Sequence, residues 1–329
     1  MSHPTTPIQI FTDAECRKDW AKLLKAKSKT IVSCHNREGL VLLEHFQPHI
    51  WSVEGPTGQS IAKNWENPAL LAKVSERILK HKTKLYLTEL RRNVAFYSKA
   101  PLPTFYRPLL TKGIVELTKA KRVLDCSVGW GGRLIGTLAV PGTHFTGIEP
   151  CEATHKGLTE MAAFLGLTDR CTLIKAGAEI ALPNLSDGAY DLMLTSPPYF
   201  DLEVYSHEDS QSTSRFKTWE TWCAGFLEPV LANCLRCLAP NGISAWSVKN
   251  FRKCPLQTKV FELHAKYGFA HVQTVGMMST ARNQGKAAKM NEETFLFKRT
   301  TCWCHDCGDK DEAFVPTMRD GNAICPDCA

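Results

Sequence analysis

The sequence predicts an α/β protein built on a doubly wound, mostly parallel sheet. From residue 122 onward, short apolar runs alternate with stretches of helical periodicity, which is the pattern of such a sheet. Hydrophobic residues make up 43% of the 329 positions, enough for a large core. Seven strands are expected, at 122–128, 144–149, 171–176, 190–195, 242–249, 271–277 and 293–298.

Helices are expected between these strands, at 132–139, 152–166, 219–238 and 256–267. The last two strands are joined by residues 279–291, which have no apolar period, so that pair should be antiparallel. Upstream, Asn67 followed by Pro68 predicts a helix start, with an N-cap and a proline in the first turn.

Charge divides the chain into three parts: a basic, helical N-terminal region (1–100), the α/β domain (101–299) and a short tail (300–329). Residues 1–121 carry 20 Lys and Arg against 10 Asp and Glu, while the tail carries 2 against 6. Basic side chains interleaved with aromatic ones suit contacts with nucleic acid, and Lys80, Lys82, Arg91 and Arg92 are candidate phosphate contacts. A solvated helical surface is the alternative.

A glycine-rich turn follows the first predicted strand of the α/β domain. Asp125 ends that strand, Gly129 and Gly131 lie in the turn, and Glu149 ends the next strand. Both carboxylates should therefore lie at the carboxyl edge of the sheet, where these folds bind ligands, with Glu149 placed to bind ribose hydroxyls. A dinucleotide site is a weaker alternative because its third glycine is replaced by Leu134.

This segment resembles the S-adenosylmethionine-binding core of class I methyltransferases, which have a Rossmann-like sheet. The resemblance implies that Asp125, Gly129, Gly131 and Glu149 bind that cofactor. It also implies that Ala178 and Glu179 border the adenine, and that the segment containing Tyr106 makes a further cofactor contact.

The fourth predicted strand stops at Ser196-Pro197-Pro198-Tyr199, because two prolines cannot continue a central strand. Its placement is similar to the catalytic signature of amino-methyltransferases, which methylate a planar nitrogen. The resemblance implies a DNA methyltransferase acting on cytosine N4 first and adenine N6 second. The Ser196 hydroxyl and the Pro197 carbonyl would accept hydrogen bonds from the amine, and Tyr199 would stack on the base.

DNA is therefore the expected partner, with its target base flipped out of the helix. Residues 201–216 are expected to form a mobile substrate loop, or else a disordered insertion. A methyltransferase of RNA bases or protein glutamine and a noncatalytic nucleic-acid-binding protein remain alternatives.

The tail contains Cys304, Cys307, Cys325 and Cys328, two Cys-x2-Cys pairs separated by 17 residues. That spacing predicts a zinc ribbon holding one structural ion. The N-terminal residues lack the basic start and apolar run of a secretory signal, and no apolar stretch approaches the length of a membrane span. We therefore expect a cytoplasmic protein whose remaining cysteines are reduced.

Overall fold

The computed structural model describes residues 4–202, 204–251, 254–278 and 290–300, and the backbone of four short strands in the tail. These tail strands are β9 (Cys302–Trp303), β10 (Lys310–Asp311), β11 (Thr317–Arg319) and β12 (Asn322–Ile324), which form two antiparallel pairs. In the described part of the chain, no helix combines the length and the apolar character needed to cross a bilayer.

The centre of the molecule is an eight-stranded sheet with the order β1-β7-β8-β6-β5-β2-β3-β4. Its strands are β1 (Ile31–Ser33), β2 (Arg122–Asp125), β3 (His144–Ile148), β4 (Cys171–Ile174), β5 (Tyr190–Thr195), β6 (Leu238–Ser247), β7 (Phe269–Met278) and β8 (Met290–Arg299). Every neighbouring pair is parallel except the two that involve β8. The fold is thus Rossmann-like and doubly wound, and the predicted antiparallel final pair is confirmed.

The prediction of seven strands was wrong by one, because β1 comes from the N-terminal region. It pairs in parallel with β7, with Val32 opposite Met277. Only the middle of its three residues is buried, so the strand leaves no alternating pattern long enough to detect. The sheet therefore joins segments that are more than 200 residues apart in the sequence.

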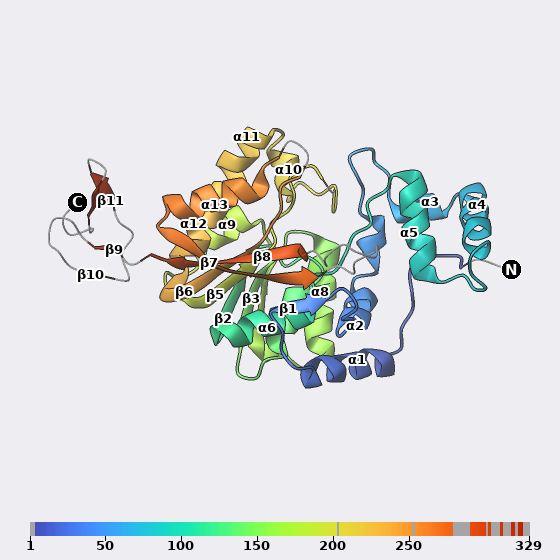
Figure 1. Ribbon diagram of the computed structural model, residues 1–329, viewed down its shortest axis with the longest axis horizontal. Helices are drawn as coiled ribbons and strands as arrows, with labels where there is room; N and C mark the ends of the chain where they lie inside the picture. The colour runs from blue at the N-terminus through green and yellow to red at the C-terminus, as the bar shows by residue number, and fades with distance from the viewer. Residues whose placement is uncertain are drawn as a thin grey trace, which may run out of the picture.

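Helices cover both faces of this sheet (Figure 1). One face packs against α6 (Pro108–Thr118), α7 (Gly132–Leu138) and α8 (Glu152–Phe164), and the other against α9 (Ala178–Ala181), α12 (Glu228–Arg236) and α13 (Leu256–Lys266). Adjacent strand residues point to opposite faces: Val123 joins the first core cluster and Leu124 the second. The expected helices at 132–139, 152–166 and 256–267 are confirmed within about two residues.

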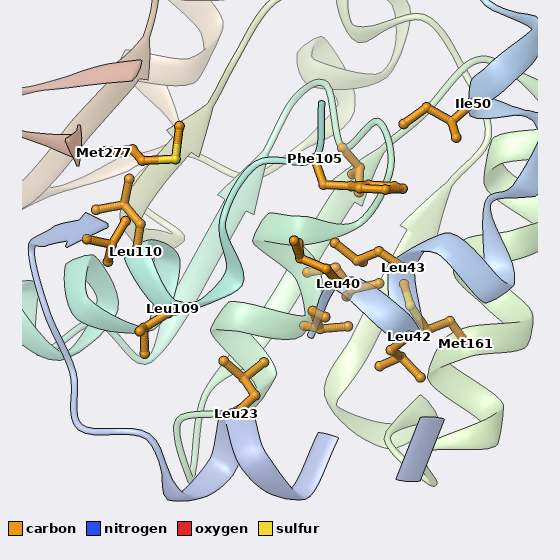
Figure 2. Packing of buried hydrophobic residues seen from close by; sticks show 14 of the residues in the cluster. Leu23, Leu40, Leu42, Leu43, Ile50, Phe105, Leu109, Leu110, Met161 and Met277 are labelled. Atoms are coloured by element: carbon orange, nitrogen blue, oxygen red, sulfur yellow. The ribbon is translucent and has the colours of Figure 1, made fainter. Parts of the chain in front are cut away.

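The N-terminal region extends the first of these cores. Helices α1 (Asp13–Lys25) and α2 (Leu40–Phe46) contribute Leu23, Leu42 and Leu43, which lie in the same buried cluster as Leu109 and Met161 (Figure 2). A short 3-10 helix (Pro48–Ser52) then leads to α3 (Ile61–Trp65), α4 (Pro68–Leu79) and α5 (Leu87–Ser98). We call these three helices the helical lobe; it lies at the opposite end of the molecule from strands β9, β10 and β11 (Figure 1).

The helix expected from Asn67-Pro68 is confirmed as α4. Asn67 caps it by accepting a hydrogen bond from the amide of Leu70 at 3.0 Å. The helix expected at 219–238 is divided into α11 (Trp219–Trp222), a π-helical segment (Cys223–Leu227) and α12, in which Pro229 stands in the first turn. The remaining short elements are α10 (Ser212–Arg215) and 3-10 turns at Thr168–Arg170 and Leu182–Asn184.

Candidate active site

A cavity of about 600 Å³ opens at the carboxyl edge of the sheet. That volume is in the range of small-molecule sites. The wall is built from segments that directly follow β2 to β6, together with residues 102–106 and the ends of β7 and β8. Nine of the residues singled out from the sequence line it: Tyr106, Gly129, Glu149, Ala178, Glu179, Ser196, Pro197, Pro198 and Tyr199.

The glycine turn shapes one side of this cavity. Gly129 lines it with φ of 56°, and Gly131 adopts φ of 86° as the N-cap of α7. Both values favour glycine, since other L-residues are strained there. Gly131 does not line the cavity. A Cβ at this position would meet Leu158 and Met161, so its role is to let α7 start against the core.

Asp125 lies beneath the cavity instead of in its wall. It is fully buried, and Arg133 Nε donates to its Oδ2 at 2.7 Å. The Ser127 amide (3.1 Å) and the Thr195 hydroxyl (2.9 Å) both donate to its Oδ1. Arg133 also bonds the Ser127 carbonyl, so this buried ion pair holds the glycine turn in place.

Glu149 follows β3 and is 7% exposed. Its two carboxyl oxygens accept from the backbone amides of Gly129 and Cys151, each at 2.9 Å. Burial raises the pKa of Glu149 to about 7, although these two hydrogen bonds lower it. The side chain thus closes the glycine turn onto the end of β3 while its carboxyl group borders the cavity.

The Ser-Pro-Pro-Tyr segment begins directly after β5 and lines the opposite side of the cavity. Thr195, the last residue of β5, joins it to Asp125 under the glycine turn. The Tyr199 ring lies 5.4 Å from the Phe251 ring, and Lys249 Nζ is 6.0 Å from the Tyr199 ring centroid. Phe200 has φ of 39°, so the chain turns sharply as it leaves the segment.

Tyr106 also lines the cavity and contacts both the last strand and Arg133. Its hydroxyl and that of Thr294 on β8 are hydrogen-bonded at 2.8 Å, and burial raises its pKa. The Arg133 guanidinium lies 5.3 Å from the Tyr106 ring centroid. The segment before α6 is thereby held against both the glycine turn and the last strand.

The segment 204–216 crosses the cavity and makes defined contacts on both sides. Val204 forms a two-bond antiparallel bridge with Glu54, next to the helical lobe. Ser210 Oγ donates to the Pro150 carbonyl at 3.3 Å, and Arg215 forms an ion pair with Glu179. Since Tyr205, Ser210, Gln211 and Ser212 line the cavity, this segment covers the side that Glu149 and Glu179 border.

Several cavity residues were missed by sequence reasoning: Trp130, Arg133, Lys249 and Glu292. Trp130 and Arg133 belong to the glycine turn itself and could have been found as its neighbours. Lys249 ends a predicted strand, whereas Glu292 follows residues with no apolar period, so no local signal marked it.

Among the basic residues considered for phosphate contact, Arg91 was assigned wrongly. Its side chain is 3% exposed, pairs with Glu44, stacks on Trp51 and donates to the Pro7 carbonyl at 2.6 Å. It therefore joins α5 to α2 and to the N-terminal segment. Lys80 and Lys82 remain half-exposed or more, although each contacts a glutamate of the helical lobe.

The four predicted zinc ligands, Cys304, Cys307, Cys325 and Cys328, lie outside the described residues. Within the residues that are described, no group of three or more His, Cys, Asp or Glu side chains could hold a metal ion. The zinc ribbon stays a prediction from spacing.

No protein-family model matches the chain, and no curated protein matches it either. Among solved structures, it is similar to a SAM-dependent O-methyltransferase from Thermotoga maritima, with 12% identity over 63% of this chain and 70% of that one, at a TM-score of 0.41. A methyltransferase from Geobacter sulfurreducens has 14% identity over 70% and 96%, at 0.40. TrmN from Thermus thermophilus has 14% identity over 71% and 79%, also at 0.40. The likeness concerns the overall α/β fold.

Proposed function

We propose that the protein transfers a methyl group from S-adenosylmethionine to the exocyclic amino group of a DNA base, cytosine N4 ahead of adenine N6. One observation carries this proposal. The glycine turn, Glu149 and the Ser196–Tyr199 segment are far apart in the sequence, yet all three line one cavity. A donor site and an acceptor site for a group transfer must adjoin in this way.

The cavity fits the proposed cofactor. Glu149 presents a carboxyl group for ribose hydroxyls, Gly177 to Glu179 form the adjoining wall, and Trp130 adds an aromatic surface. The segment 204–216 covers this side. When bound, the cofactor supplies an electrophilic methyl group on a sulfonium.

The acceptor side suits a planar amine. The lone pair of an exocyclic amine is delocalised into its ring, so the nitrogen must become pyramidal before it can attack. The Ser196 hydroxyl and the Pro197 carbonyl can accept hydrogen bonds from its two N–H groups and favour that change, and the methylated nitrogen then releases one proton to solvent. Tyr199, backed by Phe251, offers a face on which the ring can stack.

A polyanionic substrate is supported by the surface of the helical lobe. Lys73 Nζ lies 4.9 Å from the Tyr97 ring centroid, Arg77 donates to the Tyr97 hydroxyl, and the neighbouring Phe96 is 73% exposed. Cations beside exposed aromatic rings suit phosphate contacts combined with base stacking. The base must leave a duplex to enter the cavity, which costs about a few kcal/mol. RNA bases present the same amine and are the second candidate substrate.

The test is to incubate the protein with labelled S-adenosylmethionine and either DNA or RNA, then to identify methylated nucleosides by mass spectrometry. We expect N4-methylcytosine from DNA. Ser196→Ala and Tyr199→Ala should each retain affinity for S-adenosylhomocysteine in calorimetry while losing most methyl transfer. Ser186→Ala, an exposed serine outside the cavity, is the matched control.

Methylated RNA without methylated DNA would support the second candidate. If neither nucleic acid is methylated, protein is supplied as substrate instead, and methylated glutamine would support a protein methyltransferase. Binding of nucleic acid without transfer to any of these substrates would indicate a noncatalytic protein. Full activity in both cavity variants would contradict the role assigned to the Ser196–Tyr199 segment.

A further inference from the structure

Beyond Tyr199, the cavity has a second polar wall that the proposed transfer does not use. Lys249 follows β6, Glu292 lies near the start of β8, and Thr104 precedes α6. Thr104 Oγ1 is 3.5 Å from Glu292 Oε1, and Lys249 Nζ is 6.0 Å from the Tyr199 ring centroid. All three residues line the cavity that Tyr199 also lines, and of these two contacts the one from Lys249 reaches the proposed stacking face.

The carboxyl group of Glu292 has an unusual environment for an acid. Burial raises its pKa, while the nearby cations of Arg107 and Lys249 and the contact with Thr104 lower it. The net shift is upward, so this carboxyl group holds a proton more readily than an exposed glutamate does. A protonated carboxyl group can donate a hydrogen bond to a ring nitrogen.

Lys249 differs from Glu292 in chemistry and in exposure. It is an exposed residue that lines the cavity and offers three N–H donors but no acceptor. A donor on a flexible side chain thus lies next to the Tyr199 ring, and the Glu292 carboxyl group belongs to a residue that lines the same cavity.

We propose that Glu292 and Lys249 bind the ring edge next to the reacting amine and select cytosine over adenine. This inference rests on the proposed function. The edge of cytosine beside N4 presents two acceptors in succession, the ring nitrogen N3 and the carbonyl oxygen O2. Glu292 binds N3, donating a hydrogen bond when its carboxyl group carries a proton, and Lys249 donates to O2, while Ser196 and Pro197 hold the amine.

Adenine satisfies only half of this arrangement. Its ring nitrogen N1 can accept from Glu292, but the next position carries a C–H group and offers nothing to the Lys249 ammonium. Adenine therefore forms one hydrogen bond fewer than cytosine in this arrangement and should be the poorer substrate. Glu292 therefore serves both bases, and Lys249 discriminates between them.

The experiment uses the full chain and single-stranded oligonucleotides that contain either one cytosine or one adenine, so that base flipping does not differ. Initial methylation rates give a cytosine-to-adenine ratio for each variant. Lys249→Met should lower this ratio by about ten-fold, since one base-reading contact is lost. Lys156→Met, an exposed lysine on α8, should leave the ratio unchanged.

Glu292 is tested with two variants. Glu292→Gln retains an N–H donor and should keep most of the activity, whereas Glu292→Leu should lose methylation of both bases and keep its affinity for S-adenosylhomocysteine. If Glu292→Leu loses affinity for S-adenosylhomocysteine to the same extent as it loses methylation, the carboxyl group binds the cofactor and the inference is overturned. An unchanged ratio in Lys249→Met while the wild type methylates DNA would also overturn it. A wild type that methylates neither base would instead refute the proposed function, and this inference with it.

Discussion

The Thr195 hydroxyl donates a 2.9 Å hydrogen bond to the fully buried carboxylate of Asp125. Thr195 ends β5 immediately before Ser196, and Asp125 ends β2 immediately before the glycine turn. One buried contact thus sets the spacing of the two sides of the cavity. Because Arg133 and Ser127 bond the same carboxylate, the glycine turn and the Ser196–Tyr199 segment share one polar network.

Thr195→Val should weaken this network without changing the shape of the side chain. Removing a donor from a buried carboxylate is expected to lower the free energy of unfolding by about 1–3 kcal/mol. Urea unfolding measures the change. Thr159→Val, which removes the hydroxyl of an exposed helical threonine, should stay within about 0.5 kcal/mol. Equal effects of the two substitutions would show that the Thr195 contact does not couple the turns.

The raised pKa of Glu149 predicts a pH dependence of stability. Between the ordinary value of 4.5 and the folded-state value of about 7, the folded protein keeps a proton that the unfolded chain has released. The free energy of unfolding therefore falls as pH rises through this window. Glutamine cannot ionise, so the difference between the wild type and Glu149→Gln should fall by up to about 3 kcal/mol from pH 4.5 to 7. A difference that stays flat, or rises with pH, would contradict this assignment.

The exposed lysines in the connection between α4 and α5 should contribute to affinity for DNA. Replacing Lys80, Lys82 and Lys84 with glutamine should make a plot of log affinity against log salt concentration less steep, by up to about 0.9 per lost phosphate contact. A triple variant of Lys18, Lys22 and Lys25, which are exposed on α1, removes the same charge elsewhere. If both triple variants change the slope equally, the effect comes from net charge alone.

The tail should bind one zinc ion per chain through its four spaced cysteines, because two such pairs complete a tetrahedral site. The double variant Cys325→Ser/Cys328→Ser should lose the metal in elemental analysis and expose the tail to proteolysis. We expect it to keep its affinity for S-adenosylhomocysteine, since the cavity is lined by residues 102–292. A full metal equivalent in the double variant would refute the ligand set, and a loss of cofactor affinity would refute the independence of the tail.

Local patterns were sufficient for most of the sheet and for two sides of the cavity. A buried strand that meets glycines or prolines must turn at the edge of the sheet, so the positions of Gly129 and Ser196 follow from the chain itself. Parallel strands bring their carboxyl ends to one edge of the sheet. The sequence alone therefore predicts that the residues following β2, β3, β4 and β5 lie close together.

In the N-terminal region, local sequence patterns did not predict which residues are buried. Val32 is buried only because β7 lies beside it, and Arg91 is buried only because Glu44 and Trp51 meet it from other helices. Arg91 and its exposed neighbour Arg92 are the same residue type in the same basic stretch, so the sequence does not distinguish them. Burial of a charge depends on a partner that is distant in the chain, and periodicity carries no information about such partners.

The sequence by itself therefore determined the strand order along the chain, the glycine turn and the rigid Ser196–Tyr199 segment, because each is encoded by residues a few positions apart. Only the tertiary structure decided that Asp125 lies buried under the glycine turn, that the segment 204–216 contacts both Glu54 and Glu179, and that Lys249 and Glu292 line the same cavity as Tyr199. These relationships depend on which strands pair and in which register. Sheet pairing sets the register through contacts between residues far apart in the chain, so no local pattern specifies it.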